Sequence, residues 1–151
     1  MALMETLADL VAARYGPVAD AVRIPVREDA DLAVVRHGIG GLAPRLGLSA
    51  LQRVAITTAA LELARNIVVH AGFGELLLGI VDAPSGGRGL LVVARDEGPG
   101  IRDLTLAMRD GYSSVGSLGL GLPGARRLMD VFEIESVVGR GTTVVCIKWI
   151  G

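Results

Sequence analysis

Two apolar segments joined by a short turn constrain the fold of this chain more than any other feature. Residues 75–82 and 88–96 are both rich in leucine and valine, and 83–87 has the Ala-Pro-Ser-Gly-Gly composition of a turn. A second pair of segments, 132–138 and 142–150, is joined by a Gly-Arg-Gly turn, which is typical of a hairpin. Because strands paired by short turns run antiparallel, the sequence predicts a mixed, mostly antiparallel sheet.

Helical patterns surround these strands, and the segments expected to form helices are 3–15, 31–46, 49–71 and 120–131. The strongest pattern is that of 49–71, where apolar residues recur at helical spacing (Ile56, Ala60, Leu63 and Ile67). Asp29 or Asp31 is expected to cap the preceding helix. Residues 22–26 are expected to form a short strand, which Pro25 restricts to a sheet edge. The fold class is therefore α+β, a two-layer α/β sandwich with helices on one face of the sheet.

Composition excludes several classes of protein. The 151 residues suit one domain, and the longest apolar runs fall well short of the ~20 residues that cross a bilayer. Glu5 and Asp9 interrupt the first apolar stretch, so we expect no signal peptide, no membrane association and a cytoplasmic location. A net charge of −1 and five aromatic residues argue against nucleic acid as a partner. Cys146 and two histidines offer no zinc cluster, and Cys146 is expected to be a core residue.

A carboxylate and an amide lie one turn apart on the predicted helix 49–71. Glu62 and Asn66 are four residues apart and share one face, and His70 lies near the same stripe. An amide oxygen suits Mg²⁺, which prefers oxygen ligands and shares phosphate oxygens. A glutamate one turn away can accept a proton from a hydroxyl aligned on a γ-phosphate. Taken alone, this spacing is equally typical of a solvated helix face, and His70 of a residue that packs at a helix end.

Asp96 ends the second apolar strand and is followed by Glu-Gly-Pro-Gly. A carboxylate at a strand end can accept a hydrogen bond from the exocyclic amine of adenine. Gly98 and Gly100 lack a Cβ, so the backbone there can approach a base or sugar closely. Ile101 is placed to wall the base, and Thr142, near the start of the last strand, to face it beside Asp96. Taken alone, these residues are also typical of a simple turn and of a hairpin.

A glycine-rich run, Gly116-Ser117-Leu118-Gly119-Leu120-Gly121-Leu122, precedes the last predicted helix. Glycines at a helix start expose backbone N–H groups, and the helix dipole adds positive potential, so the run predicts a phosphate site. No Gly-Lys-Ser/Thr follows it and no strand leads directly into it, which excludes a P-loop and a Rossmann turn. Small residues across 103–118 suit a mobile lid, although a flexible loop before a glycine-rich helix would look the same.

In this order, the four patterns resemble the boxes of the Bergerat-fold ATPases, the superfamily of gyrase, chaperone and histidine-kinase ATPase domains. The resemblance spans about 22–150 and implies an N-terminal extension, 1–20, with a possible short helix, followed by one ATPase domain, 21–151. The matching residues are Glu62, Asn66 and His70 in the N-box, Asp96, Gly98 and Gly100 in the first glycine box, Gly119 and Gly121 in the second, and Gly141 and Thr142 in the third.

Four strings, ITTAALELARNIVVHAG, DEGPGI, DGYSS and GLGLPGARRLMD, are similar to those of the small serine/threonine-protein kinases of the anti-sigma-factor and stressosome switch-kinase type. This resemblance implies ATP- and Mg²⁺-dependent phosphorylation of a STAS-domain partner in a partner-switching module. It also implies binding and activation of a PP2C-type phosphatase. Glu62 would be the base, Asn66 would hold Mg²⁺, Asp96 would read adenine, and the backbone of 116–122 would wrap the phosphates.

One departure from that family keeps an alternative open. Kinases of the anti-sigma type often carry an arginine near the end of the lid, whereas no basic residue lies between Arg109 and Arg126 here. Either arginine, or a partner's residue, would have to neutralise the transition-state charge; otherwise the chain is a nucleotide-binding docking module with little phosphoryl transfer. A histidine-kinase catalytic domain is disfavoured because glycine follows His37, and a gyrase- or chaperone-type machine because 151 residues leave no space for a second domain.

Overall fold

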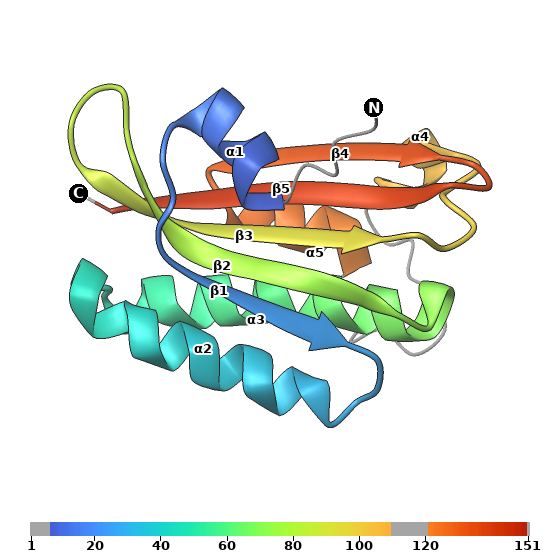
Figure 1. Cartoon of the computed structure of the whole chain (residues 1–151), viewed down its shortest axis with the longest axis horizontal. Coiled ribbons are helices and arrows are strands. Elements are labelled where there is room, and N and C mark those ends of the chain that lie inside the picture. Colours follow the sequence, from blue (N-terminus) through green and yellow to red (C-terminus); the bar gives the residue numbers. More distant parts are fainter. Residues whose placement is uncertain (1–6, 110–120, 151) are drawn as a thin grey trace.

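One antiparallel sheet organises the molecule. The computed structural model describes residues 7–109 and 121–150, and the described strands pair in the order β1-β2-β3-β5-β4, each pairing antiparallel (Figure 1). The sheet of described strands is thus antiparallel throughout, in line with the predicted mostly antiparallel sheet, and β1 lies at its edge as Pro25 indicated. The strands are β1 (Ala19–Val26), β2 (Gly74–Asp82), β3 (Arg88–Asp96), β4 (Val131–Val137) and β5 (Gly141–Ile150).

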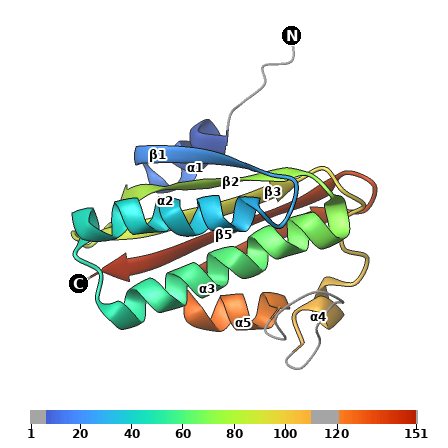
Figure 2. The ribbon, with the colours of Figure 1, turned by 90° about the horizontal axis from the view of Figure 1, so that it is seen from below.

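Helices cover both faces of the sheet, in unequal amounts. The described helices are α1 (Leu7–Tyr15), α2 (Asp31–Leu46), α3 (Ala50–Asn66), the π-helical turn η1 (Ile67–Ala71), α4 (Leu104–Ala107) and α5 (Gly121–Leu128). Helices α2, α3 and α5 pack on one face and enclose the main core, as predicted (Figure 2). Helix α1 differs: it packs on the opposite face, where Val11 contacts a second cluster that includes Leu77 and Leu91. This face needs a cover because the strands carry apolar side chains on both of their sides.

Helix α3 is the central element of the helical layer. Its first turn closes a capping box, in which Ser49 Oγ accepts from the Gln52 N–H (3.1 Å) and Gln52 Oε1 accepts from the Ser49 N–H (2.9 Å). The prediction of one helix over 49–71 needs a correction, because 67–71 winds as a π-helical turn. The turn ends at Gly72, whose N–H donates to the Ile67 carbonyl oxygen (2.8 Å). The φ of Gly72 is 82°, a left-handed conformation that favours glycine.

Helix α3 and η1 together form one stretch, Ala50–Ala71, that is long and apolar enough to cross a membrane by length and composition alone. In this structure, 44% of its most apolar window is buried, and it contacts α2, α5, β3 and β5. This packing is that of the core helix of an α+β sandwich.

The structure corrects the predicted cap of α2 and shows how this helix packs on the sheet. Neither Asp29 nor Asp31 caps the helix: the N-cap is Ala30, and Asp31 Oδ2 accepts instead from the N–H groups of Arg27 (2.8 Å) and Glu28 (3.2 Å). Helix α2 contains three glycines, Gly38, Gly40 and Gly41. A Cβ on Gly38 would lie 2.9 Å from Leu78 Cδ1, so at this glycine the helix is packed tightly onto β2.

The C-terminal elements follow the predicted hairpin. Within the described residues helix α5 covers 121–128, and it ends before the predicted residue 131 because β4 already begins at Val131. Cys146 lies fully buried on β5, and this burial raises the pKa of its thiol to about 12. The thiol is therefore a protonated core side chain, as expected.

Candidate active site

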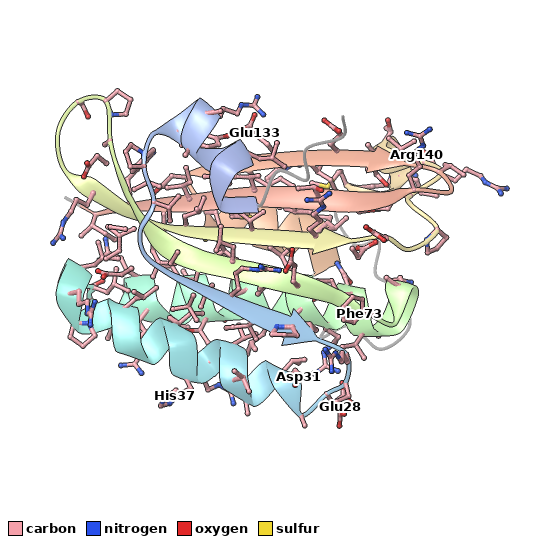
Figure 3. All side chains as sticks on the ribbon, in the orientation of Figure 1. Glu28, Asp31, His37, Phe73, Glu133 and Arg140 are labelled. Atoms are coloured by element: carbon pink, nitrogen blue, oxygen red, sulfur yellow. The ribbon has the colours of Figure 1, made fainter. Side chains whose placement is uncertain are left out.

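A cavity of about 260 Å³ lies between the C-terminal end of α3 with η1 and the ends of β3 and β5. Its lining residues come from the end of the molecule where the η1–β2 and β4–β5 connections lie, which the labelled Phe73 and Arg140 mark in Figure 3. The loop after β3, Ala107 of α4 and the start of α5 complete its wall. Of the residues predicted from the sequence, eight line it: Asn66, His70, Asp96, Gly100, Ile101, Gly121, Leu122 and Thr142.

The remaining predicted residues fall into two groups. Glu62 and Gly98 lie beside the cavity without lining it. Gly116, Gly119 and Leu120, together with most of the predicted lid, lie outside the described residues.

Asn66 and His70 reach the cavity from the C-terminal end of the central helix. Asn66 is half-buried at the last position of α3, while His70 is exposed within η1. A π-helical turn holds more residues than an α-helical one, so it changes which side chains face the sheet, and such turns are frequent at functional sites. Here both Asn66 and His70 line the cavity across this change of winding.

A row of residues crosses the sheet at the floor of the cavity. Asp96 on β3 pairs with Thr142 on β5, and Thr142 pairs in turn with Ser136 on β4. Asp96 Oδ1 accepts a hydrogen bond from the Gly98 N–H (2.9 Å). Within the described residues no group donates to its other carboxylate oxygen, so Asp96 retains an acceptor for a ligand at a half-buried position. Asp96 and Thr142 are thus brought together as predicted.

The glycines after β3 also lie close to neighbouring parts of the protein. A Cβ on Gly98 would lie 2.6 Å from Ala71 Cβ, and one on Gly100 would lie 2.5 Å from the Val137 carbonyl oxygen. Both glycines therefore make room for neighbouring protein, namely the end of η1 and the β4–β5 hairpin. Gly100 also has a φ of 77°, which L side chains rarely adopt. Only Gly100 of the two also lines the cavity.

Glu62 contacts the start of α5. Its side chain is fully buried on α3, and its Oε2 accepts a hydrogen bond from the Gly121 N–H at 3.1 Å. The first N–H groups of a helix have no partner within the helix and attract negative charge. Glu62 is the carboxylate predicted to act as a base, and the Gly121 N–H belongs to the run predicted to hold phosphate. These two predicted groups are therefore hydrogen-bonded to each other in this structure.

The two arginines considered as substitutes for a lid arginine do not line the cavity and lie on the surface. Arg109 follows α4 and Arg126 lies on α5, and both are exposed. Their exposure leaves either side chain accessible to a bound ligand or a partner.

The fold and this arrangement agree with a known family. Residues 24–149 match the family model described as the histidine kinase-like ATPase domain, which is most of the chain. The chain belongs to this family. The α+β fold and the resemblance noted from the sequence are thereby confirmed.

Two relatives of known activity define the function of the chain further. The serine/threonine-protein kinase RsbT of Bacillus subtilis (strain 168) is 45% identical over 120 residues, which are 80% of this chain and 90% of that protein. An anti-sigma F factor of Thermoanaerobacter sp. (strain X514) is 30% identical over 99 residues, 64% of this chain and 69% of the relative. The chain is thus a serine/threonine-protein kinase of the partner-switching kind, and it uses ATP.

A solved structure shares the fold. It contains the RsbU and RsbW domains of Rv1364c from Mycobacterium tuberculosis, and it superposes with a TM-score of 0.58 at 18% identity. The likeness covers 86% of this chain and 32% of that longer chain, and at this identity it concerns the fold alone.

Proposed function

We propose that this kinase transfers the γ-phosphate of ATP to a serine or threonine of a STAS-domain protein, and that it also binds and activates a PP2C-type phosphatase. The observation that carries the catalytic part is the cavity itself, in which an amide, a carboxylate and a threonine converge between one helix and the sheet. In this assignment Asp96 reads adenine, Asn66 lies on the phosphate side and Glu62 is the base. The domain comprises 21–151, with 1–20 as an extension, and we expect the protein in the cytoplasm.

The residues around the cavity fit one Mg²⁺ ion held mainly by a nucleotide. Among the described residues, no group of three or more His, Cys, Asp and Glu side chains could form a protein cage for a metal. A half-buried amide, Asn66, does line the cavity, and Mg²⁺ is typically held by one or two protein oxygens plus phosphates and water. Asn66 would hold the ion, which neutralises charge on the phosphates when it is bound.

Phosphoryl transfer to the proposed partner is tested directly. The purified chain is incubated with Mg²⁺, γ-labelled ATP and a STAS-domain protein encoded near it, and the label on the partner is followed. Label on a serine or threonine of the partner supports the proposal. ATP binding without any label would instead support the nucleotide-binding docking module, and a pull-down with a PP2C-type phosphatase tests the second half.

Asn66→Ala is expected to remove the Mg²⁺ dependence of nucleotide binding. Wild-type affinity for ATP should rise about tenfold or more on adding Mg²⁺, whereas the variant should show nearly equal affinity with and without the ion. Isothermal titration with ATP in Mg²⁺ and in EDTA measures this ratio. Gln52→Ala, which changes an amide at the other end of the same helix, is the control and should keep the wild-type ratio. An unchanged ratio in Asn66→Ala contradicts the metal assignment.

Asp96→Asn is expected to weaken ATP binding by about 10–100-fold and to leave GTP less disfavoured. The amide keeps an oxygen for the Gly98 N–H but replaces the second acceptor with a donor, which opposes the adenine amine and suits the guanine carbonyl. Fluorescence competition with ATP and GTP measures the change. Asp130→Asn, away from the cavity, is the matched control. If Asp96→Asn binds ATP like the wild type, the base lies elsewhere.

A further inference from the structure

Ser136 adjoins the cavity without lining it, and the sequence patterns did not single it out. It lies on β4 directly opposite Thr142, which pairs on its other side with Asp96. Ser136, Thr142 and Asp96 therefore lie side by side on three neighbouring strands, and Asp96 is the carboxylate proposed to bind the base. Thr142 lines the cavity, whereas Ser136 lies behind it.

The hydroxyl of Ser136 makes three contacts at once. It accepts a hydrogen bond from the Ile101 N–H at 2.7 Å, lies 2.8 Å from Thr142 Oγ1 and lies 3.3 Å from the Gly141 carbonyl oxygen. A serine hydroxyl has one hydrogen and two lone pairs. Because the Ile101 N–H occupies one lone pair, the single hydrogen goes either to Thr142 or to Gly141.

These two arrangements give Thr142 opposite properties. If Ser136 donates to Thr142 Oγ1, the Thr142 hydrogen is available to donate into the cavity. If Ser136 donates to Gly141, Thr142 donates back to Ser136 and can only accept from a ligand. The Ser136–Thr142 contact has the length of a good O–H···O bond, whereas 3.3 Å is beyond the usual range. When Ser136 makes Thr142 a donor, the only hydrogen bond lost is therefore the weak one from Ser136 to the Gly141 carbonyl oxygen.

Ser136 also fixes the wall opposite the helix. Its bond to the Ile101 N–H and the bond from the Gly139 N–H to the Pro99 carbonyl oxygen (2.8 Å) join the loop after β3 to the β4–β5 hairpin. Ile101 lines the cavity beside Thr142. A single hydroxyl thus holds both a polar and an apolar element of the proposed base pocket.

We propose that Ser136 is a positioning residue that holds the Thr142 hydroxyl as a donor toward ring nitrogen N1 of adenine. Adenine presents its amine and the N1 acceptor side by side, which suits a carboxylate acceptor and a hydroxyl donor on adjacent strands. The inference rests on the proposed nucleotide site and extends it to a residue outside the cavity. It assigns part of the purine selectivity to Ser136.

The test compares ATP with 1-deaza-ATP, in which a C–H group replaces N1. Dissociation constants are measured for the wild type, Ser136→Ala, Ser136→Thr and Thr143→Val. The wild type should prefer ATP by about tenfold, and Ser136→Ala should reduce this preference to about twofold, mainly by weakening ATP binding. Ser136→Thr retains the hydroxyl and should show the wild-type preference for ATP over 1-deaza-ATP. Thr143 is the control because its neighbour Thr142 points to the cavity and successive strand residues face opposite sides.

Each outcome decides between the proposals. Equal weakening of both nucleotides by Ser136→Ala, or no preference in the wild type, overturns the role of Ser136 while leaving the nucleotide site intact. Absence of binding of either nucleotide to the wild type overturns the proposed function instead. If Ser136→Ala does not fold, Thr142→Val supplies the test, since it removes the donor itself. Retention of the tenfold preference in that variant overturns the inference.

Discussion

The Glu62→Gln variant is expected to keep its fold and its affinity for ATP while losing phosphoryl transfer by about 10²–10⁴-fold. Glutamine has the shape of glutamate and retains an oxygen that accepts from the Gly121 N–H, so the buried contact between α3 and α5 survives. It cannot accept the proton of an attacking hydroxyl. Because the packing is retained, the loss of activity reports on proton transfer alone. The rate of phosphoryl transfer is measured as label incorporated into the partner in single-turnover assays.

Glutamine is a sharper probe at this position than alanine. Because Glu62 is fully buried, alanine would leave a cavity and would deprive the Gly121 N–H of this acceptor, which typically costs about 1–3 kcal/mol. Loss of activity in Glu62→Ala could then reflect a displaced α5. Glu75→Gln, which alters an ion pair between β2 and Arg23 on the edge strand β1, is the matched control and should transfer phosphate like the wild type. Near-normal transfer by Glu62→Gln would remove Glu62 from the role of base.

The Glu62–Gly121 contact also adds a step to the expected reaction. The same carboxylate that would accept a proton is engaged at the N-terminus of α5 in this structure. Because a carboxylate has two oxygens, Glu62 can act on a hydroxyl while Oε2 keeps the Gly121 N–H, but that N–H must leave Oε2 before it can hold a phosphate oxygen. A phosphate is the natural replacement, because the N–H of a helix start favours an anion in either case.

The elements with local signals could be predicted from the sequence. The two hairpins follow from turn composition between apolar runs, and the start of α3 from a serine followed three residues later by glutamine. Both signals act over a few residues, so they do not depend on the rest of the chain. The approach of Asn66 and Asp96 could be predicted only through the resemblance to a known family, since nothing local joins a helix end to a strand end.

The features that the sequence did not reveal depend on register and on long-range packing. The contact between Glu62 and Gly121 joins residues 59 positions apart and is set by how α5 packs on α3. The π-helical turn at 67–71 leaves no periodic pattern, because it is a single turn. Ser136 could have been found by counting back from the Gly-Arg-Gly turn, which places it opposite Thr142 in the hairpin.

The third glycine box shows how a motif residue can be explained by packing alone. Gly141 has a φ of 129°, and a Cβ built there would overlap the carbonyl oxygen of Asp96. Asp96 and Glu97 are backbone neighbours that cannot rotate away as a flexible side chain could. The glycine is therefore required for β5 to lie against β3 at the position where Thr142 and Asp96 meet.

Gly141→Ala is accordingly expected to destabilise the domain by about 3–5 kcal/mol, which combines backbone strain with overpacking. For a chain of this size the melting temperature should fall by about 10 °C, as measured by calorimetry. Gly139→Ala in the same turn is the matched control. Its φ of 82° is also positive, but a Cβ there meets nothing within 4 Å, so only the strain remains. That control should cost about 1 kcal/mol.

The difference between the two alanine variants measures the close approach of β5 to β3 alone. It should be accompanied by a loss of ATP affinity in Gly141→Ala under conditions where the variant is still folded, because the strand shift needed to admit the methyl group separates Thr142 from Asp96. Gly139→Ala should bind ATP like the wild type. Equal destabilisation by the two variants would mean that β5 can move aside without cost. In that case the spacing of Asp96 and Thr142 would not be set by the glycine.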